Sequence, residues 1–360
     1  MAGVYLSYPF CAQKCTYCNF GSGVFPRELA GRYLEALRRE IQNHEWAWRP
    51  ETVYLGGGTP SVLEPSQVLE MLNQVPGAPW IEATIEVAPG TVSVEKAAGW
   101  VKAGINRVSL GVQSFVRSEL VRTGRKHTAE LVAAEIGVLR AAGIGNINID
   151  LIAGLPGQTA ASWNESLRWV DRLGPEHVSV YMLEVDDDSR LGREILAGGV
   201  RYGAADVPGE ELVVEFYEMA VEHLSREGLM RYEISNFARP GRESLHNLKY
   251  WRLEPYRGFG ADAHSFDGKL RWQNPEAVAA YLEAHTPMAT ETHPEEEKFF
   301  LGLRLAAGVR PEQEEWLRYH EPIQRFVSAG LLTTDSGGML RLTERGILLS
   351  NEVFQAFLAA

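Results

Sequence analysis

The sequence predicts an α/β fold in which six strands alternate with helices and form a partial, TIM-like (β/α)6 barrel. Two observations carry this prediction. Short apolar segments of strand length recur through the first 185 residues, and segments with helical spacing of apolar residues separate them. Strands that alternate with helices in this way form parallel sheets with both faces covered. Six repeats fall short of the eight that close a complete barrel, so we expect a partial or open one.

The predicted strands and helices alternate through the first half of the chain. In a parallel sheet of this kind, the loops that follow the carboxyl ends of the strands line the functional site. Polar residues at those ends are therefore the first candidates for chemistry. We expect strands at residues 4–7, 52–55, 83–87, 107–111, 147–152 and 177–183. We expect helices at residues 27–46, 65–72, 94–103, 128–142 and 162–173.

The second half of the chain has a less regular pattern. Residues 186–209 are polar and rich in glycine, so we expect an irregular excursion there, followed by a helix at 211–226. Near the end, residues 331–342 contain an Asp-Ser-Gly-Gly turn between apolar segments, which predicts a hairpin. We also expect short helices around this hairpin, so the last part of the chain should form a small helical, winged-helix-like domain.

An acidic segment at residues 286–297 divides the chain. It contains proline and lacks apolar periodicity, which is typical of a linker. The sequence therefore predicts a core domain over residues 1–285, followed by the linker and a small C-terminal domain over 298–360. The core domain consists of a barrel at about 1–185 and an extension at 186–285.

Composition and charge disfavour several classes of protein. With 45% hydrophobic residues, the chain is too apolar to be mainly disordered. Its net charge of −12 disfavours a nucleic-acid-binding protein, which usually carries a basic face. No apolar run reaches the roughly 18 residues of a membrane span, and the first residues lack the features of a secretory signal. We expect a cytoplasmic protein, for which peripheral contact with a membrane stays open.

All three cysteines of the chain lie within eight positions, at Cys11, Cys15 and Cys18. An odd number of cysteines cannot form a closed disulfide framework, and such crowding indicates a metal or cluster site in a reducing compartment. Three thiolates can hold three irons of a 4Fe-4S cluster and leave the fourth iron open to a substrate or cofactor. A zinc site is one alternative, although it needs a fourth ligand and the nearest histidine is His44. Three incidental thiols are the other alternative.

Glycines and a carboxylate follow the second and third predicted strands. Gly57, Gly58 and Thr59 belong to a Gly-Gly-Gly-Thr-Pro segment, in which glycine permits positive φ and a close approach of the backbone to a small polar ligand. A tight turn would explain the same glycines. Glu86 ends the third strand, where a carboxylate can accept hydrogen bonds from ribose hydroxyls. The alternative is a capping or salt-bridging glutamate.

Three further polar residues lie at the ends of the next strands. Asp150 lies within an apolar strand, and a buried carboxylate is costly unless it has a partner or a ligand. Arg125 is the partner that we expect for it. For these two residues and for Gln113, a ligand-binding role and a structural pairing both stay open.

The segment from Cys11 to Cys18, CAQKCTYC, resembles the loop that defines radical S-adenosylmethionine (SAM) proteins. The resemblance implies a 4Fe-4S cluster on Cys11, Cys15 and Cys18. It also implies that the amino and carboxylate groups of SAM chelate the open iron. A reduced cluster would then cleave SAM to methionine and a 5′-deoxyadenosyl radical, with the protein positioning the groups and excluding competing reactions.

Further segments narrow this resemblance to one branch of the superfamily. GGGTPS, IEVAPG, GVQSF, NIDLIAGLPGQT and HVSVYMLE occur in order, and LTERG follows near the end. They resemble the branch that contains oxygen-independent coproporphyrinogen dehydrogenase (HemN) and the HemW haem chaperones. The positions that this resemblance places near one or two SAM molecules are Tyr5, Tyr17, Gly57, Gly58, Thr59, Glu86, Gln113, Arg125, Asp150 and Glu184.

Two departures distinguish the chain from the dehydrogenase of this branch. The dehydrogenase motif runs C-x3-C-x2-C-x-C, whereas Phe20 occupies the last position here. The dehydrogenase also carries a long N-terminal extension, whereas here the first strand begins within five residues of Met1. Both departures put oxidative decarboxylation of coproporphyrinogen III in doubt, although that reaction or another radical SAM reaction, such as a methylation, stays the alternative.

The segment HNLKYW, which begins at His246, resembles the HemW group instead. The resemblance implies a haem chaperone that carries haem as its cargo and delivers it to apo-proteins. Since histidine is a common axial ligand of haem iron, His246 is a candidate haem ligand. The alternative is a structural turn whose aromatic residues join the core. His264 follows a glycine-rich loop, and we expect a structural role for it.

Overall fold

A twelve-stranded sheet organises the chain, and parallel strands form its centre. This computed structural model describes residues 2–283 and 287–358. The sheet order is β12-β11-β10-β9-β1-β2-β3-β4-β5-β6-β8-β7. Each strand from β1 to β6 pairs in parallel with the next, which confirms the predicted alternation of strands and helices. These strands are β1 (Ala2–Tyr8), β2 (Pro50–Gly57), β3 (Glu82–Val87), β4 (Arg107–Gln113), β5 (Asn146–Ala153) and β6 (His177–Met182).

Short strands extend this centre at both edges. β9 pairs in parallel with β1, whereas β10, β11 and β12 continue the sheet in antiparallel fashion. At the other edge, β8 and β7 follow β6, also antiparallel. The sequence analysis missed these strands because two to four residues are too few for a recognisable alternation of apolar side chains. They are β7 (Met230–Arg231), β8 (Asn236–Ala238), β9 (Tyr256–Phe259), β10 (His264–Phe266), β11 (Leu270–Gln273) and β12 (Met288–Glu291).

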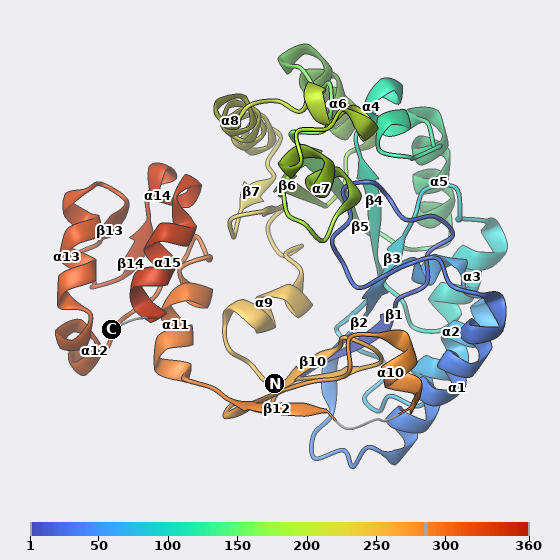
Figure 1. Cartoon of the computed structure of the whole chain (residues 1–360). Helices are drawn as coiled ribbons and strands as arrows, with labels where there is room; N and C mark the ends of the chain where they lie inside the picture. The colour runs from blue at the N-terminus through green and yellow to red at the C-terminus, as the bar shows by residue number, and fades with distance from the viewer. Residues whose placement is uncertain (1, 284–286, 359–360) are drawn as a thin grey trace.

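Helices cover the outer face of the curved central sheet (Figure 1). On the first of them, Tyr33, Leu37 and Ile41 are buried at the four-residue spacing that keeps apolar side chains on one face. That helix ends at Asn43, three residues before the predicted end. The helices of this layer are α1 (Arg27–Asn43), α2 (Pro65–Leu72), α3 (Val94–Lys102), α4 (Arg117–Arg122), α5 (Ala129–Ala141), α6 (Ala160–Leu173) and α8 (Glu210–Arg226), with a short 3-10 turn at Pro60–Val62 and α10 (Val278–Glu283) beside α1.

Helix α6 illustrates how local sequence sets these elements. The Thr159 side chain accepts a hydrogen bond from the backbone of Ser162 and caps the first turn. Gly174 ends the helix at a φ of 54°, a left-handed conformation that favours glycine. Trp163 faces inward, stacks on Phe216 of α8 with 6.1 Å between ring centroids, and donates its Nε1–H to the Phe216 carbonyl at 2.7 Å. The buried indole N–H at this contact between the two helices therefore has a hydrogen-bond partner.

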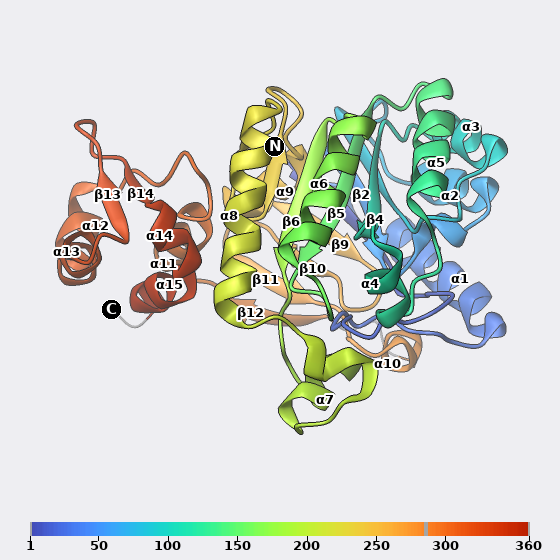
Figure 2. The ribbon, with the colours of Figure 1, turned by 90° about the horizontal axis from the view of Figure 1, so that it is seen from above.

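Helix α9 (Leu245–Trp251) closes the amino-terminal end of the barrel. Glu82, the first residue of β3, accepts hydrogen bonds from the backbone N–H groups of Leu245 and His246, both at 2.9 Å, and from the Ser244 hydroxyl at 3.3 Å. Arg107 of β4 lies beside this carboxylate, and both side chains are buried. Figure 2 shows α9 at one end of the sheet and α7 (Arg190–Leu196) at the other.

The C-terminal residues form a small helical unit with a hairpin beside the barrel (Figures 1 and 2), and the Ala306 N–H donates to the Tyr232 carbonyl at 3.0 Å. Three aromatic rings form its core: Phe299 stacks on Phe357 at 4.8 Å between centroids and lies tilted against Tyr319 at 4.6 Å. The predicted hairpin at 331–342 is present. The elements are α11 (Pro294–Gly302), α12 (Gln313–Arg318), α13 (His320–Ser328), β13 (Leu332–Thr334), β14 (Leu340–Leu342), α14 (Glu344–Leu348) and α15 (Ser350–Leu358).

The expected linker at 286–297 is not a simple connection. Residue 286 lies outside the described residues, but 288–291 form β12 at the edge of the large sheet and α11 begins at Pro294. Both elements were missed because the segment is acidic. The exposed strand β12 has no apolar periodicity, and the acidic residues after Pro294 form the first turn of α11, where negative charge is favourable. Arg231 also joins the two parts through hydrogen bonds to Glu344 at 2.8 and 2.7 Å. The division into domains stays a prediction.

Among the described residues, no helix is both long and apolar enough to cross a membrane.

The contacts of Glu82 generate a prediction about stability. Glu82→Ala removes the acceptor for two N–H groups of α9 and leaves the buried Arg107 without its neighbouring carboxylate. We expect the free energy of unfolding to fall by about 3 kcal/mol, measured by urea denaturation. Glu95→Ala, at an exposed position of α3, is the matched control and should change it by less than about 0.5 kcal/mol. Equal effects of the two substitutions would contradict this role of Glu82.

Candidate functional site

The cysteine loop connects β1 to α1 at the carboxyl end of the central strands. Its two sides are tied together because Cys11 donates its backbone N–H to Gly23 at 2.8 Å and Gly23 donates to Pro9 at 2.9 Å. Its middle is tied to the segment after α4, because the Thr16 N–H reaches the Thr123 carbonyl at 3.3 Å. The loop therefore has a defined path over the strand ends, although it contains no regular element of its own.

The glycine segment after β2 lies directly against the start of this loop. Gly58 donates its N–H to the Tyr8 carbonyl at 2.8 Å, and Thr59 donates to the Phe10 carbonyl at 2.9 Å. A Cβ atom on Gly58 would lie 2.7 Å from the carbonyl carbon of Pro9 and 2.8 Å from the Phe10 oxygen, which is closer than real Cβ contacts. Gly57 has a φ of 109°, which also favours glycine. The predicted close approach is thus an approach of the glycines to the cysteine loop itself.

The three thiols are free and partly buried. Burial raises the pKa of the Cys11 thiol, and hydrogen bonds with the side chains of Thr59 and Ser22 act against this rise. Among residues 2–283 and 287–358, no three His, Cys, Asp or Glu side chains converge closely enough to hold a single metal ion. The three thiolates of a 4Fe-4S cluster would each bind a different iron.

Beneath the loop, partly buried polar side chains of adjacent strands face one another inside the barrel. Tyr5 of β1 and Tyr54 of β2 are register partners, and their rings stack at 6.1 Å. The Tyr54 hydroxyl donates to Glu86 of β3 at 3.0 Å, and the N–H of Gly57 donates to the other oxygen at 3.1 Å. Burial first, and the charge of Asp150 next, raise the pKa of Glu86 to about 7. One carboxylate therefore joins the glycine segment to the barrel interior.

Tyr54 was missed by the sequence analysis, although a signal for it was present. Thr52, Tyr54 and Gly56 alternate along β2 and have the period of residues that face one side of a strand. Since Tyr5 was predicted to face the site, its neighbour in parallel register follows from the strand alignment alone.

The expected direct pair of Asp150 and Arg125 is wrong. Asp150 accepts hydrogen bonds from Asn148 at 2.7 Å and from Ser109 at 3.3 Å, and its pKa is raised by burial. Arg125 instead donates to the Tyr17 hydroxyl at 3.0 Å and to the Gly111 carbonyl at 2.5 Å. The two charged groups still face each other at longer range, because the Asp150 charge is among the influences that raise the pKa of Arg125.

Gln113 has features that are typical of ligand-binding residues. Its φ of 71° is unusual for a residue other than glycine, and the pairing of β4 with β5 is irregular at this point. Its Oε1 atom is buried and has no hydrogen-bond partner. Strained backbone positions and unpaired buried polar atoms both concentrate at functional sites. An acceptor here is ready for an amino or hydroxyl group of a bound molecule.

The segment after β6 holds the cysteine loop from the side. Glu184 is exposed and lies 3.4 Å from the Asn19 amide nitrogen, and Asp186 accepts a hydrogen bond from the same nitrogen at 2.8 Å. The N–H of Leu191 in α7 donates to the Thr16 carbonyl at 2.8 Å. The excursion at 186–209 thus contains α7 and a 3-10 turn, η2 (Arg201–Asp206), in place of irregular chain throughout.

His246 lies at the opposite end of the barrel from the cysteines. It is 1% exposed, its Nδ1 lies 2.9 Å from the Thr52 hydroxyl, and its Nε2 lies 2.8 Å from the Tyr250 hydroxyl. Burial, with the charges of Lys249 and Arg107, lowers its pKa to about 3. Since both ring nitrogens are occupied, the structure does not present His246 as an iron ligand and favours the structural alternative. His264 is an exposed residue of β10.

Comparison with known proteins agrees with this arrangement. Residues 5–170 match the family model described as the radical SAM superfamily. The chain is 35% identical to the "Heme chaperone HemW" of Bacillus subtilis, over 99% of both chains. It is 30% identical to the protein of that name from Escherichia coli, over 99% of this chain and 98% of the relative.

A solved structure shows the same fold over the whole chain. The coproporphyrinogen III oxidase HemN from Escherichia coli superposes with a TM-score of 0.85 at 22% identity, covering 99% of this chain and 89% of that one. At this identity the likeness is one of fold.

The burial of His246 generates a prediction about pH. Its pKa is about 3 when folded against an ordinary value of 6.5, so near pH 5.5 the unfolded chain binds a proton that the folded chain does not. The free energy of unfolding should therefore fall as the pH falls. We expect the wild type to lose about 1.4 kcal/mol more than His246→Gln between pH 7.5 and 5.5, measured by denaturant unfolding. Parallel pH profiles would show that His246 titrates normally and is accessible.

Proposed function

The chain belongs to the radical SAM superfamily and, within it, to the family of the heme chaperone HemW, and on this premise we propose that it binds haem and passes it to apo-proteins. The observation that carries the proposal is similarity along the entire chain, at 30% to 35% identity, to relatives of that name in several bacteria. Phe20, which is 69% exposed, supports it by standing where the dehydrogenase motif has a fourth cysteine.

A 4Fe-4S cluster on Cys11, Cys15 and Cys18 is the second part of the proposal. It is supported by three free thiols that lie within eight positions on one loop. When bound, the cluster would supply electrons and an open iron for SAM. The loop contributes a fixed path over the strand ends, which Gly58 and Thr59 maintain through their backbone hydrogen bonds.

The residues proposed to bind SAM are those at the carboxyl ends of the strands. Glu86 would accept hydrogen bonds from ribose hydroxyls, and Gln113 would accept one at its unpaired Oε1 atom. Arg125 would face an anionic group, with Tyr17 holding its Nε. The complete proposed set is Tyr5, Tyr17, Gly57, Gly58, Thr59, Glu86, Gln113, Arg125, Asp150 and Glu184.

Oxidative decarboxylation of coproporphyrinogen III is the alternative function. The superposition on HemN favours it only at the level of fold, since one fold serves many activities. The chain also lacks the fourth cysteine of that enzyme's motif. We therefore place the carrier function first.

One experiment separates the two functions. The chain is reconstituted without oxygen, loaded with haem and mixed with the apo-form of a haem protein. The Soret band then reports the transfer of haem from the chain to the acceptor. We expect transfer to the acceptor. In parallel, the haem-free chain receives SAM, a reductant and coproporphyrinogen III, and we expect no decarboxylated product. Product formation at a useful rate, or retention of haem by the loaded chain, would contradict the proposal.

A further inference from the structure

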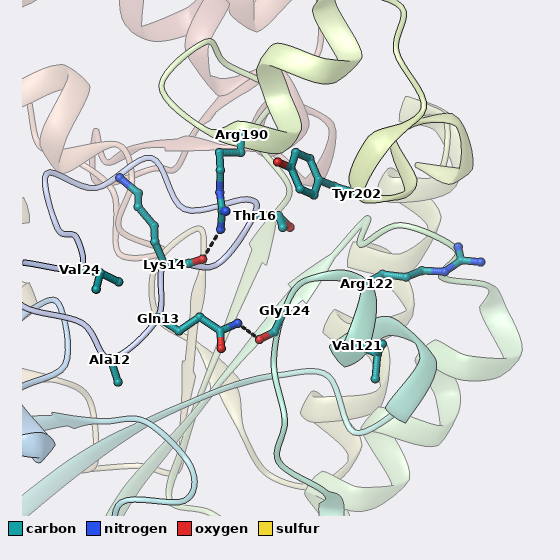
Figure 3. Close-up of a pocket in the computed structure, with 10 residues that line it drawn as sticks. All are labelled: Ala12, Gln13, Lys14, Thr16, Val24, Val121, Arg122, Gly124, Arg190 and Tyr202. Atoms are coloured by element: carbon teal, nitrogen blue, oxygen red, sulfur yellow. Dashed lines mark hydrogen bonds between the residues drawn. The ribbon is translucent and has the colours of Figure 1, made fainter.

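An open pocket lies beside the cysteine loop, on the side of α7 and η2 (Figure 3). Its volume of about 580 Å³ is within the usual range of small-molecule sites. The cysteine loop forms one wall, the end of α4 forms a second, and α7 with η2 forms the third. The lining residues are Ala12, Gln13, Lys14, Thr16, Val24, Val121, Arg122, Gly124, Arg190 and Tyr202.

The pocket is positively charged in a chain whose net charge is −12. Three cations and no carboxylate line it. Arg122 is neutralised by Asp206 at 2.9 Å. Lys14 and Arg190 have no ion-pair partner in the described part of the chain, and instead donate to the carbonyl groups of Phe20 and of Lys14 respectively. Two uncompensated cations beside a cavity indicate an anionic ligand.

Apolar surface accompanies these charges. Val24 and Val121 line the pocket and are 63% and 59% exposed. Tyr202 adds an aromatic ring, above which the Arg190 guanidinium lies at 5.5 Å from the centroid. Figure 3 shows Arg190 descending between Tyr202 and Lys14. The pocket thus has apolar side chains on separate walls, with Lys14 and Arg190 between them.

The backbone of Tyr202 has a strained conformation, which determines the direction of its ring. Its φ of 58° is uncommon for a residue other than glycine and costs on the order of 1 kcal/mol. Neighbouring contacts hold the turn, because Asp206 pairs with Arg122 and its carbonyl accepts the N–H of Gly157 at 2.7 Å. Such positions cluster at ligand clamps.

A ligand with an apolar body and two carboxylates would use both the apolar side chains and the two cations, and haem has these features. We propose that this pocket holds the haem cargo, with the macrocycle against Val24, Val121 and Tyr202 and the two propionates paired with Lys14 and Arg190. This site rests on the proposed carrier function and gives it a location next to the cysteine loop.

A second pocket is a weaker candidate for the same cargo. It lies between α9, β11 and α11, includes Trp251 of the HNLKYW segment, and has a volume of about 270 Å³. Its one cation, Arg271, is already paired with Glu297. It therefore offers less than half of the space and no free charge for a propionate.

The test compares haem with its dimethyl ester, which lacks the propionate charges. The full chain, loaded with its cluster without oxygen, is titrated with each compound and the Soret band gives the dissociation constants. We expect the wild type to bind haem at least tenfold more tightly than the ester, since a charge-assisted hydrogen bond is worth about that factor. Arg190→Ala should weaken haem binding about tenfold and leave ester binding nearly unchanged. Arg201→Ala, an exposed arginine of η2 that does not line the pocket, should bind as the wild type does.

The comparison separates charge recognition from structural damage, because a distorted pocket would weaken both compounds alike. The proposed site would be overturned if Arg190→Ala still preferred haem over the ester as strongly as the wild type does. It would also be overturned if Trp251→Ala lost haem binding while Arg190→Ala bound haem normally. In either case the carrier function would still stand. A wild type that binds no haem would overturn the carrier function, and the site with it.

Discussion

The end of β2 lies so close to the beginning of the cysteine loop that only glycine fits between them. Gly58 touches the backbone of Pro9 and Phe10, and its N–H is bonded to Tyr8. On its other side, the preceding N–H of Gly57 binds Glu86. This one segment therefore fixes the cysteine loop over the strand ends and connects it to the carboxylate proposed to bind ribose. The relative positions of the thiols, the interior carboxylates and the pocket beside the loop therefore depend in part on this contact.

Buried polar groups with and without partners occur at both ends of the barrel. At the amino-terminal end, Glu82 caps α9 and both nitrogens of His246 have partners, whereas Arg107 Nε and Asn146 Oδ1 have no hydrogen-bond partner among the described residues. At the carboxyl-terminal end, Gln113 keeps an unpaired oxygen on strained backbone, and Glu86 has a raised pKa. Buried polar groups with full sets of partners stabilise a fold, whereas those with vacant positions are suited to ligands. His246, with partners on both nitrogens, fits a structural role, and ligand binding at the strand ends is what we propose.

Which features could be predicted from the sequence depends on how far apart in the chain the interacting residues lie. The central strands and most of their helices are long enough for periodic patterns, so their positions were predicted to within a few residues, and the helix at Pro65–Leu72 without error. The six-residue helix α4 was missed because it is too short for such a pattern. The edge strands at 230–291 are too short for such patterns and depend on pairing with β1 and β6. The cysteine loop was evident from spacing. Thr52, which pairs with His246, and Tyr17, which pairs with Arg125, come from distant segments. No local pattern could therefore reveal that His246 is buried and that Arg125 does not pair directly with Asp150.

The most direct test of the central contact is the iron and acid-labile sulfide content of Gly58→Ala after anaerobic reconstitution. Gly137→Ala is the matched control, since a Cβ on this residue of α5 meets nothing within 4 Å. The account predicts that Gly58→Ala, folded by circular dichroism, holds only a minor part of the wild-type iron and sulfide, while Gly137→Ala holds all of it. Full wild-type content in Gly58→Ala would show that the cysteine loop does not need this close approach, and would contradict the account.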